Sequence, residues 1–258
     1  MRGLIAAVLL SATPCTEASP LPVLPGEELH YRVAWALLPG AGEIRLSAER
    51  QEDPAGTRLR VVTQTRTLGL ARMLLPFEAR ATADFTLADG RLRWLREETR
   101  QRGEQRAHQV AFDYTAGHAL WTADDAPSAS RALPLPPGEP TDMILGLLRT
   151  RDWNLEPGSQ RDALVLFNDE FYELTIHCTG RETVETPLGT FRTRVLEPRM
   201  ERTAPKGMFR RGGTVRVWIA EDRWRLPVRF TVEFKVGRGV ATLTGHRPPP
   251  SDAPPAHP

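Results

Sequence analysis

Alternation of apolar and polar side chains is the strongest pattern along the chain. In Val228–Val236 every second residue is apolar and the residues between are polar. A period of two is typical of a β-strand with one buried face. The same pattern recurs in several shorter segments: Tyr31–Trp35, Glu43–Ser47, Arg58–Val61, Arg80–Leu87 and Thr214–Ile219. The pattern therefore predicts an antiparallel sheet of about ten or more strands.

Turn sequences separate these segments. Asp89-Gly90 lies between residues 79–87 and 92–98, which predicts a tight hairpin. A sheet in which each strand has one apolar face buries those faces best when it curves around a core. We therefore predict an all-β fold with one or two short helices, in which a strongly curved antiparallel sheet forms a barrel or half-barrel.

The main predicted helix lies in the segment Pro140–Arg149. Thr141 or Asp142 can cap its first turn, and the apolar residues Ile144, Leu147 and Leu148 share one face at helical spacing. We expect this short amphipathic helix to plug an end or the open side of the rolled sheet. A second helical turn is predicted within Leu68–Leu75.

The first residues have the pattern of a secretory signal peptide. Arg2 precedes the apolar run Leu4–Leu10, which is shorter than the roughly 20 residues that a membrane-spanning helix needs. We interpret residues 1–18 as a signal peptide with cleavage after Ala18. The alternative, a lipoprotein modified at Cys15, is disfavoured because a proline precedes that cysteine. The mature chain is then expected to be periplasmic or secreted, without a transmembrane segment.

The remaining sequence divides at its C-terminus. Residues 26–246 are predicted to form a single β-rich domain. Residues 247–258 contain six prolines and no large apolar side chain, which predicts a disordered tail.

The overall charge of the chain is nearly balanced and adds little to these predictions. The chain has 258 residues, with 34 Lys and Arg against 32 Asp and Glu, a formal net charge of +2. This balance argues against a polybasic nucleic-acid-binding protein. With 40% hydrophobic residues, the chain is long enough to bury a core without a disulfide or a metal.

Motifs for catalysis are missing from the sequence. It contains no phosphate-binding loop, dinucleotide fingerprint, zinc-binding His pair or nucleophile elbow, and the six histidines are scattered singly. Cys178 is the one cysteine left after cleavage, and we interpret it as a small buried apolar residue. His177 beside it would point to the opposite face of a strand. We therefore expect no enzyme activity, cofactor or metal site.

Four residues are candidates for ligand binding. Trp35 and Trp218 would form an apolar wall if they lined one cavity, although Trp218 is also explained by a structural hairpin. Arg210 and Arg211 belong to a basic loop at residues 199–211, which could contact anionic lipid, glycan or a partner protein. The simpler interpretation of that loop is a mobile hairpin.

Several ordered motifs resemble a known family. They are Pro25–Trp35, Gly180 followed by Gly189-Thr190-Phe191-Arg192-Thr193, Gly213–Asp222 and Arg225–Val228. Together they resemble the exported bacterial family of domain of unknown function 3108, over residues 26–245. The resemblance implies a β-rich envelope protein and carries no catalytic residues.

Two functional hypotheses follow. The first is an exported periplasmic or envelope protein without a catalytic site that binds an apolar or amphiphilic ligand in its rolled sheet. The alternative is a structural or assembly factor that binds another envelope protein. A hydrolase would require converging acidic groups, which the sequence cannot show.

Overall fold

The computed structural model describes residues 21–52, 56–206, 209, 213–234 and 237–250. Its dominant feature is one 15-stranded sheet with the order β8-β7-β6-β5-β4-β3-β2-β1-β15-β14-β13-β12-β11-β10-β9. All neighbouring pairs are antiparallel except the short parallel pair β9 and β10. The strands are β1 (Glu28–Trp35), β2 (Leu38–Gln51), β3 (Arg58–Thr67), β4 (Phe77–Thr86), β5 (Leu92–Gln101), β6 (Glu104–Asp113), β7 (His118–Ala123), β8 (Arg131–Pro134), β9 (Pro140–Thr141), β10 (Gln160–Phe167), β11 (Glu170–Thr186), β12 (Gly189–Arg199), β13 (Val215–Ala220), β14 (Pro227–Phe234) and β15 (Gly237–Arg247).

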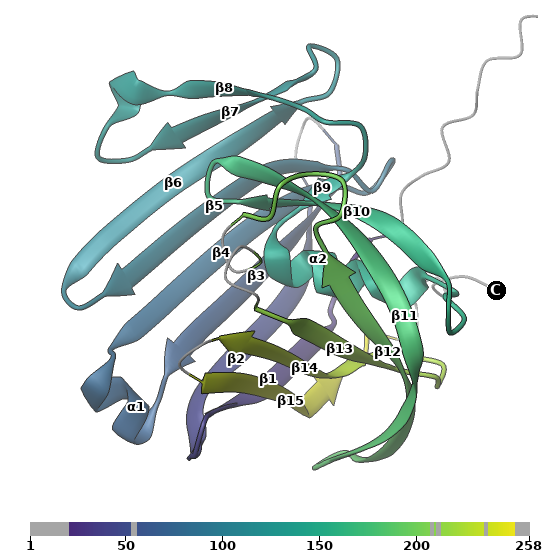
Figure 1. Ribbon diagram of the computed structural model, residues 1–258. Coiled ribbons are helices and arrows are strands. Elements are labelled where there is room, and N and C mark those ends of the chain that lie inside the picture. Colours follow the sequence, from purple (N-terminus) through teal and green to yellow (C-terminus); the bar gives the residue numbers. More distant parts are fainter. Residues whose placement is uncertain (1–20, 53–55, 207–208, 210–212, 235–236, 251–258) are drawn as a thin grey trace, which may run out of the picture.

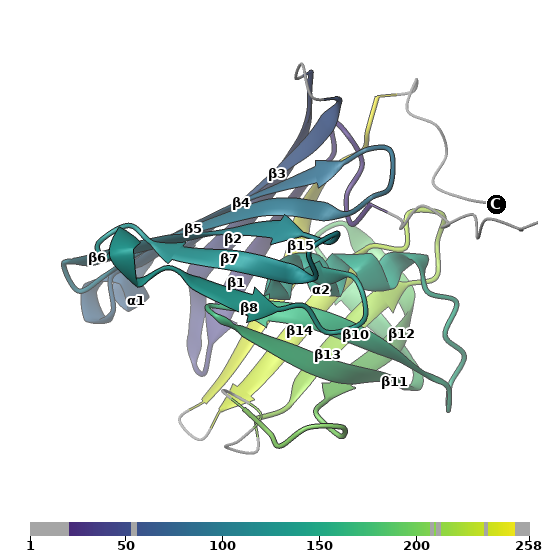
Figure 2. The same cartoon turned by 90° about the horizontal axis from the view of Figure 1, so that it is seen from above.

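The first and last strands pair in the middle of this sheet. Glu28 is paired with Arg247, and Trp35 at the other end of β1 is paired with Gly239. From this central pair, one half of the sheet continues from β1 to β8 and the other from β15 to β9. The two halves curve toward each other around one helix and leave the sheet unclosed (Figures 1 and 2). The predicted all-β, half-closed fold is therefore confirmed.

The central helix is α2 (Met143–Arg149), and it begins as the sequence predicts. The side chain of Asp142 accepts hydrogen bonds from the amides of Ile144 and Leu145, at 2.8 and 2.9 Å. This satisfies two of the amide groups that a first helical turn leaves without an intrahelical partner. Of the two caps that the sequence allows, Asp142 is the one that forms.

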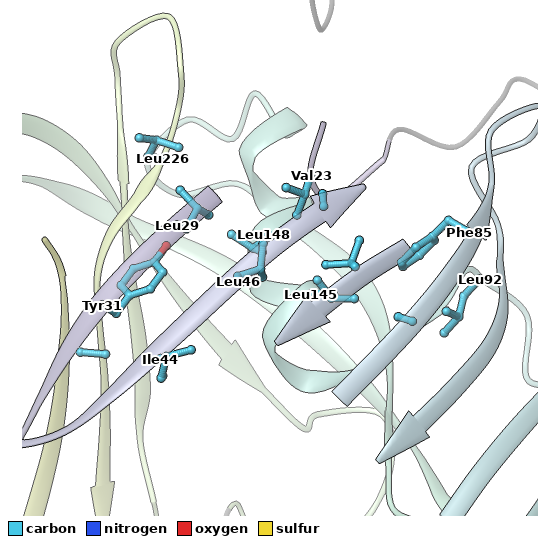
Figure 3. Packing of buried hydrophobic residues seen from close by; sticks show 14 of the residues in the cluster. Val23, Leu29, Tyr31, Ile44, Leu46, Phe85, Leu92, Leu145, Leu148 and Leu226 are labelled. Atoms are coloured by element: carbon cyan, nitrogen blue, oxygen red, sulfur yellow. The ribbon is translucent and has the colours of Figure 1, made fainter. Parts of the chain in front are cut away.

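Two faces of α2 pack against the two halves of the sheet. Leu145 and Leu148 belong to the larger hydrophobic cluster, and Figure 3 shows them beside Val23, Leu29 and Leu46. Met143 and Leu147 pack against a second cluster, which strands β10–β14 supply. Burying a leucine side chain contributes about 1.5–3 kcal/mol. The helix therefore fills the interior between the two halves.

Another short helix, α1 (Gly69–Leu74), connects β3 to β4 within the predicted segment Leu68–Leu75. It differs from α2 because none of its residues is buried. Its first turn has no side-chain cap. The connection is thus ordered but exposes its apolar side chains.

The loop between β7 and α2 holds more structure than its composition indicates. It contains one turn of 3₁₀ helix, η1 (Pro127–Ala129), followed by the strands β8 and β9. A second 3₁₀ turn, η2 (Thr150–Asp152), follows α2. Strand β8 ends in Pro134, which an edge strand tolerates because its outer amides need no partner. The proline-rich sequence of this region therefore forms a sheet edge.

Contacts of the described chain extend beyond both borders of the predicted domain. Val23 is fully buried, so the packed chain begins before residue 26. Arg247 ends β15 and forms an ion pair with Glu28, and Pro250 lies against Gly26. The start of the predicted tail is therefore packed. The signal peptide, Cys15 and residues 251–258 lie outside the described residues.

Candidate ligand-binding pocket

A pocket of about 280 Å³ lies beside α2, where β9, β10 and β11 meet the helix. The apolar residues that line it are Ala163, Leu164, Leu174 and Trp153. The other lining residues are the charged side chains Glu139, Arg149, Arg161, Asp162, Glu173 and Arg202, together with Pro137, Gly138, Thr141 and Gly146. The lining of the pocket therefore combines apolar and charged residues.

Close packing of α2 against the sheet positions this pocket. A Cβ atom at Gly146 would lie 3.1 Å from both Thr141 Oγ1 and Val165 Cγ2, a distance tighter than most contacts in proteins. The missing side chain lets the helix approach β9 and β10. Arg149 follows three residues later and so lies on the same face of the helix.

Arg149 is the most unusual residue of the pocket because it is a buried cation. Its exposed fraction is 8%, and its Nη2 and Nη1 atoms donate to the backbone oxygens of Gly90 and Glu139, at 2.9 and 3.5 Å. Its Nε atom is buried without a hydrogen-bond partner. In the part of the chain that the structure describes, no carboxylate forms an ion pair with it. Arginine stays protonated in proteins, so this positive charge is buried without a direct ion-pair partner among the described residues.

Burial has the expected effect on this guanidinium. Loss of water contact lowers the pKa of Arg149, and the nearby carboxylates of Glu139 and Asp152 oppose that change. The ring of Phe85 lies 5.8 Å below the guanidinium carbon. A buried charge with an unused N–H group is costly unless an anion completes the site.

The other arginines that line the pocket have partners. Arg202 is paired with Asp162 at 2.7 Å, and the Asp162 carboxylate also accepts a bond from Thr175. Arg161 stacks its guanidinium 4.9 Å from the ring centre of Trp153. These pairs leave Arg149 as the buried group best placed to receive an acceptor from a bound molecule.

In a second buried cluster the charged side chains are paired with each other. Glu27 is fully buried and lies 3.0 Å from Arg151 and 3.1 Å from His246 Nε2. Arg151 also donates to the backbone oxygen of Trp224 through Nε and Nη2. The charges of Glu27 and Arg151 compensate each other inside the protein. We therefore assign this cluster a structural role that requires no ligand.

A third polar cluster lies on the inner face of β5 and β6. Glu97 and His108 approach to 3.1 Å, and the His108 ring stacks on Trp121. Burial, together with the charge of Glu97, raises the pKa of Asp142 to about 7, although hydrogen bonds from the amides of Leu145 and Ile144 oppose the rise. A neutral carboxylic acid at this cap is thus favoured at low pH. No hydroxyl or thiol nucleophile is bonded to these groups in the described structure.

Trp35 and Trp218, the two tryptophans predicted to bind a ligand, lie on opposite faces of the sheet. Residues that are paired across neighbouring strands point to the same face of the sheet. Trp35 is paired with Gly239 of β15, Gly239 with Val232 of β14, and Val232 with Val215 of β13, so Trp35 shares a face with Val215. Trp218 lies three residues beyond Val215, and an odd step along a strand reverses the face. The two indoles therefore do not form one wall.

Each indole has its own local role. Trp35 packs against Gly237 and Gly239, with its ring atoms 3.3–3.6 Å from the positions of their absent Cβ atoms. Trp218 is buried, and its Nε1 donates to Glu182 at 2.8 Å. The far end of β11 curls over β14 at this point, where Arg229 donates to the backbone oxygen of Glu185.

The predicted basic loop is described only in part. Arg210 and Arg211 lie outside the described residues, so their role stays a prediction. Arg202 is paired with Asp162, and Lys206 lies 3.6 Å from Glu170. Phe209 packs against the second hydrophobic cluster, so this apolar residue of the loop is turned to the protein.

Arg149 was missed by the sequence reasoning although the sequence held a signal for it. It lies four residues after Leu145 and so falls on the buried stripe of the helix.

Cys178 is buried as expected, and burial raises the pKa of its thiol. Among the described residues, no three His, Cys, Asp or Glu side chains are close enough to hold a metal ion. No described helix has the length and hydropathy required to cross a bilayer.

The open, strongly curved sheet around one helix defines a β-barrel-like protein. The chain belongs to the family described as protein of unknown function DUF3108, which matches residues 30–244. The predicted family is therefore confirmed. A search of curated proteins found no match.

The solved structures that resemble this chain are distant in sequence. A beta-barrel-like protein of domain of unknown function DUF1849 from Brucella abortus has a TM-score of 0.53 and 9% identity, over 87% of this chain and 98% of that chain. A protein from Bacteroides fragilis, described as a candidate exported protein with a YmcC-like fold, has a TM-score of 0.37 and 13% identity, over 89% of this chain and 99% of that chain. The first likeness supports the fold alone.

Proposed function

We propose that this protein is a non-enzymatic envelope protein that binds an amphiphilic ligand with an anionic group in the pocket beside α2. One observation carries the proposal. Arg149 is a buried cation that forms no direct ion pair with a described carboxylate, in a pocket lined by both apolar and charged residues. An anion on an alkyl chain would supply a direct ion-pair partner and cover the apolar lining residues.

The strength of such a contact can be bounded. A hydrogen bond to a charged group contributes about 1.5–3 kcal/mol, which corresponds to roughly ten- to hundredfold in affinity. The alkyl part would add the gain from burying apolar surface against Leu164, Leu174 and Trp153. The anionic group should therefore decide the specificity of binding.

Binding of decyl phosphate and of decanol tests the proposal. The two probes share an alkyl chain and differ in charge, and isothermal calorimetry would compare them on the wild-type protein and on Arg149→Met. Decyl phosphate should bind the wild type at least about tenfold more tightly than decanol, and Arg149→Met should remove this preference. Arg32→Gln is the control, because that exposed arginine lies on β1 and does not line the pocket. Equal affinity for the two probes, or no saturable binding, would disprove the proposal.

The envelope location is part of the same proposal. It is supported by the signal-peptide pattern of residues 1–18, and it is tested by fractionating cells that produce the full chain. The alternative, an assembly factor acting through Arg210 and Arg211, stays a prediction.

A further inference from the structure

Apolar side chains gather at one end of the molecule, away from the pocket. Leu70, Met73 and Leu74 of α1 are 65%, 80% and 75% exposed, and Leu37 in the β1–β2 turn is 95% exposed. Single exposed leucines are common on protein surfaces. Several large apolar side chains at one end of a molecule indicate an interaction site.

The two apolar segments belong to the same end of the sheet. The amide of Leu68 donates to the backbone oxygen of Ala41, which places the start of α1 against β2. Both α1 and the turn between β1 and β2 lie at the lower end of the molecule in Figure 1. Leucine and methionine side chains from two separate connections thus project from one end.

This end is held in place although it is not buried. Thr67 Oγ1 donates to the backbone oxygen of Leu75, and Arg72 is paired with Glu78 at 2.9 Å. The amide of Arg102 donates to the backbone oxygen of Pro76, which ties the β5–β6 turn to the end of α1. A helix of six residues would not be stable alone, so these contacts fix its apolar side outward.

Unpaired cations lie beside the apolar end. Arg80, Arg100 and Arg102 are exposed, and in the described part of the chain none of them has an acidic partner. Arg100 bonds only to the neutral side chain of Gln105. Arg80 and Arg100 line a groove of about 350 Å³ next to this end. By register, their side chains share the face of the sheet opposite to α2.

The remaining charges of this region largely cancel. Arg66 is paired with Glu43 at 2.6 Å, and Arg72 is paired with Glu78. The net positive charge therefore comes from the three unpaired arginines. Positive charge around protruding apolar side chains matches the chemistry of a membrane interface that contains anionic lipids.

We propose that this end, defined by Leu37, Leu70, Met73, Leu74, Arg80, Arg100 and Arg102, docks on an anionic lipid surface. The apolar side chains enter the boundary between headgroups and acyl chains, and the arginines bind lipid phosphates. A fluid bilayer surface suits two projecting segments because it does not require a matching concave partner. The proposal is independent of the pocket beside α2.

Flotation with lipid vesicles tests the proposal. The wild-type protein is mixed with vesicles of phosphatidylcholine alone or with added phosphatidylglycerol, and the bound fraction is measured against lipid concentration. We expect binding to the anionic vesicles that is at least about tenfold stronger than to the neutral ones and that weakens with added salt. Leu70→Ser/Met73→Ser/Leu74→Ser and Arg80→Gln/Arg100→Gln/Arg102→Gln should each weaken binding about tenfold or more.

Two control variants match these changes elsewhere on the surface. Leu120→Ser/Leu188→Ser removes two other exposed leucines, and Arg32→Gln/Arg50→Gln/Arg192→Gln removes three other exposed arginines. Both controls should bind like the wild type, and circular dichroism should show that all variants are folded. No binding to anionic vesicles, or equal loss in the controls, would overturn the proposal. Self-association through the leucines, seen by analytical ultracentrifugation without vesicle binding, would replace it with a contact between copies.

Discussion

Arg151 donates a hydrogen bond of 3.0 Å to Glu27, a residue 124 positions earlier in the chain. Both side chains are buried, and His246 completes the site by donating through Nε2 to the other carboxylate oxygen at 3.1 Å. The contact joins the segment before β1 to the turn η2 after α2. It therefore couples the central strand pair to the helix that fills the interior.

Removing the charge of Glu27 from its contact with Arg151 should destabilise the protein strongly. Glu27→Gln keeps the shape of the side chain but leaves Arg151 as a buried unpaired cation, which should cost about 3–5 kcal/mol. For a protein of this size the melting temperature should fall by roughly 6–20 °C in thermal denaturation. Glu104→Gln, which breaks the exposed pair with Arg106, should leave the melting temperature unchanged. A similar melting temperature for both variants would contradict the prediction.

The same carboxylate should make stability depend on acid pH. Burial alone would raise the pKa of Glu27, but the bonds from His246, Arg151 and the Leu24 amide lower it from 4.5 to about 2. A lowered pKa stabilises the folded state fully above pH 4.5, and this contribution is lost as the pH falls toward 2. The loss is on the order of 3 kcal/mol. Urea unfolding at several pH values should show wild type and Glu27→Gln converging as the pH falls. A constant difference between them would show that Glu27 is not ionised in the fold.

Asp142 should have the opposite pH dependence. Its pKa in the folded protein is about 7, above the ordinary value of 3.8, so the stability it contributes is complete below pH 3.8 and is lost as the pH rises through 7. Asp142→Asn keeps an acceptor for the Ile144 and Leu145 amides but cannot ionise. The stability of Asp142→Asn relative to wild type should rise between pH 4 and pH 8, by an amount on the order of a few kcal/mol. Asp142→Ala, which removes the cap, should cost about 0.5–2 kcal/mol. Parallel pH profiles of wild type and Asp142→Asn would refute the raised pKa.

Gly146 should resist a larger side chain. Its neighbours Thr141 and Val165 are buried and cannot move aside easily, so Gly146→Val should cost about 1–3 kcal/mol in urea unfolding. The shift of α2 should also weaken decyl phosphate binding at Arg149. Gly180→Ala is the control, because a Cβ atom there meets nothing within 4 Å. Equal stability of the two glycine variants would mean that α2 is not tightly packed on the sheet.

Local patterns predicted the local elements. The described part of the alternating segment, Val228–Phe234, lies in β14, and Asp89-Gly90 joins β4 and β5 as an antiparallel hairpin. Asp142 caps α2 because a short acceptor side chain before an apolar helical stripe satisfies free amides. These features depend on neighbours in sequence, so one sequence is enough to find them.

Features that depend on distant pairing could not be predicted. The position of β1 beside β15 and the reversed faces of Trp35 and Trp218 depend on register, which no local pattern gives. The same holds for the contact of Glu27 with Arg151. The edge strand β8 was not predicted, because its proline is unfavourable in an internal strand and is acceptable only at an edge. Arg149 was hidden because a charge at a helix end usually faces solvent.

The pairing of β1 with β15 has a consequence for the order in which the molecule is assembled. Translation delivers β1 long before β15, so one edge of β1 waits for its partner until Gly237–Arg247 have been made. A shortened product that stops before Gly237 would leave one edge of β1 and one edge of β14 unpaired. Folding should then be late and cooperative, and premature termination should give an aggregating product, because open strand edges recruit other chains.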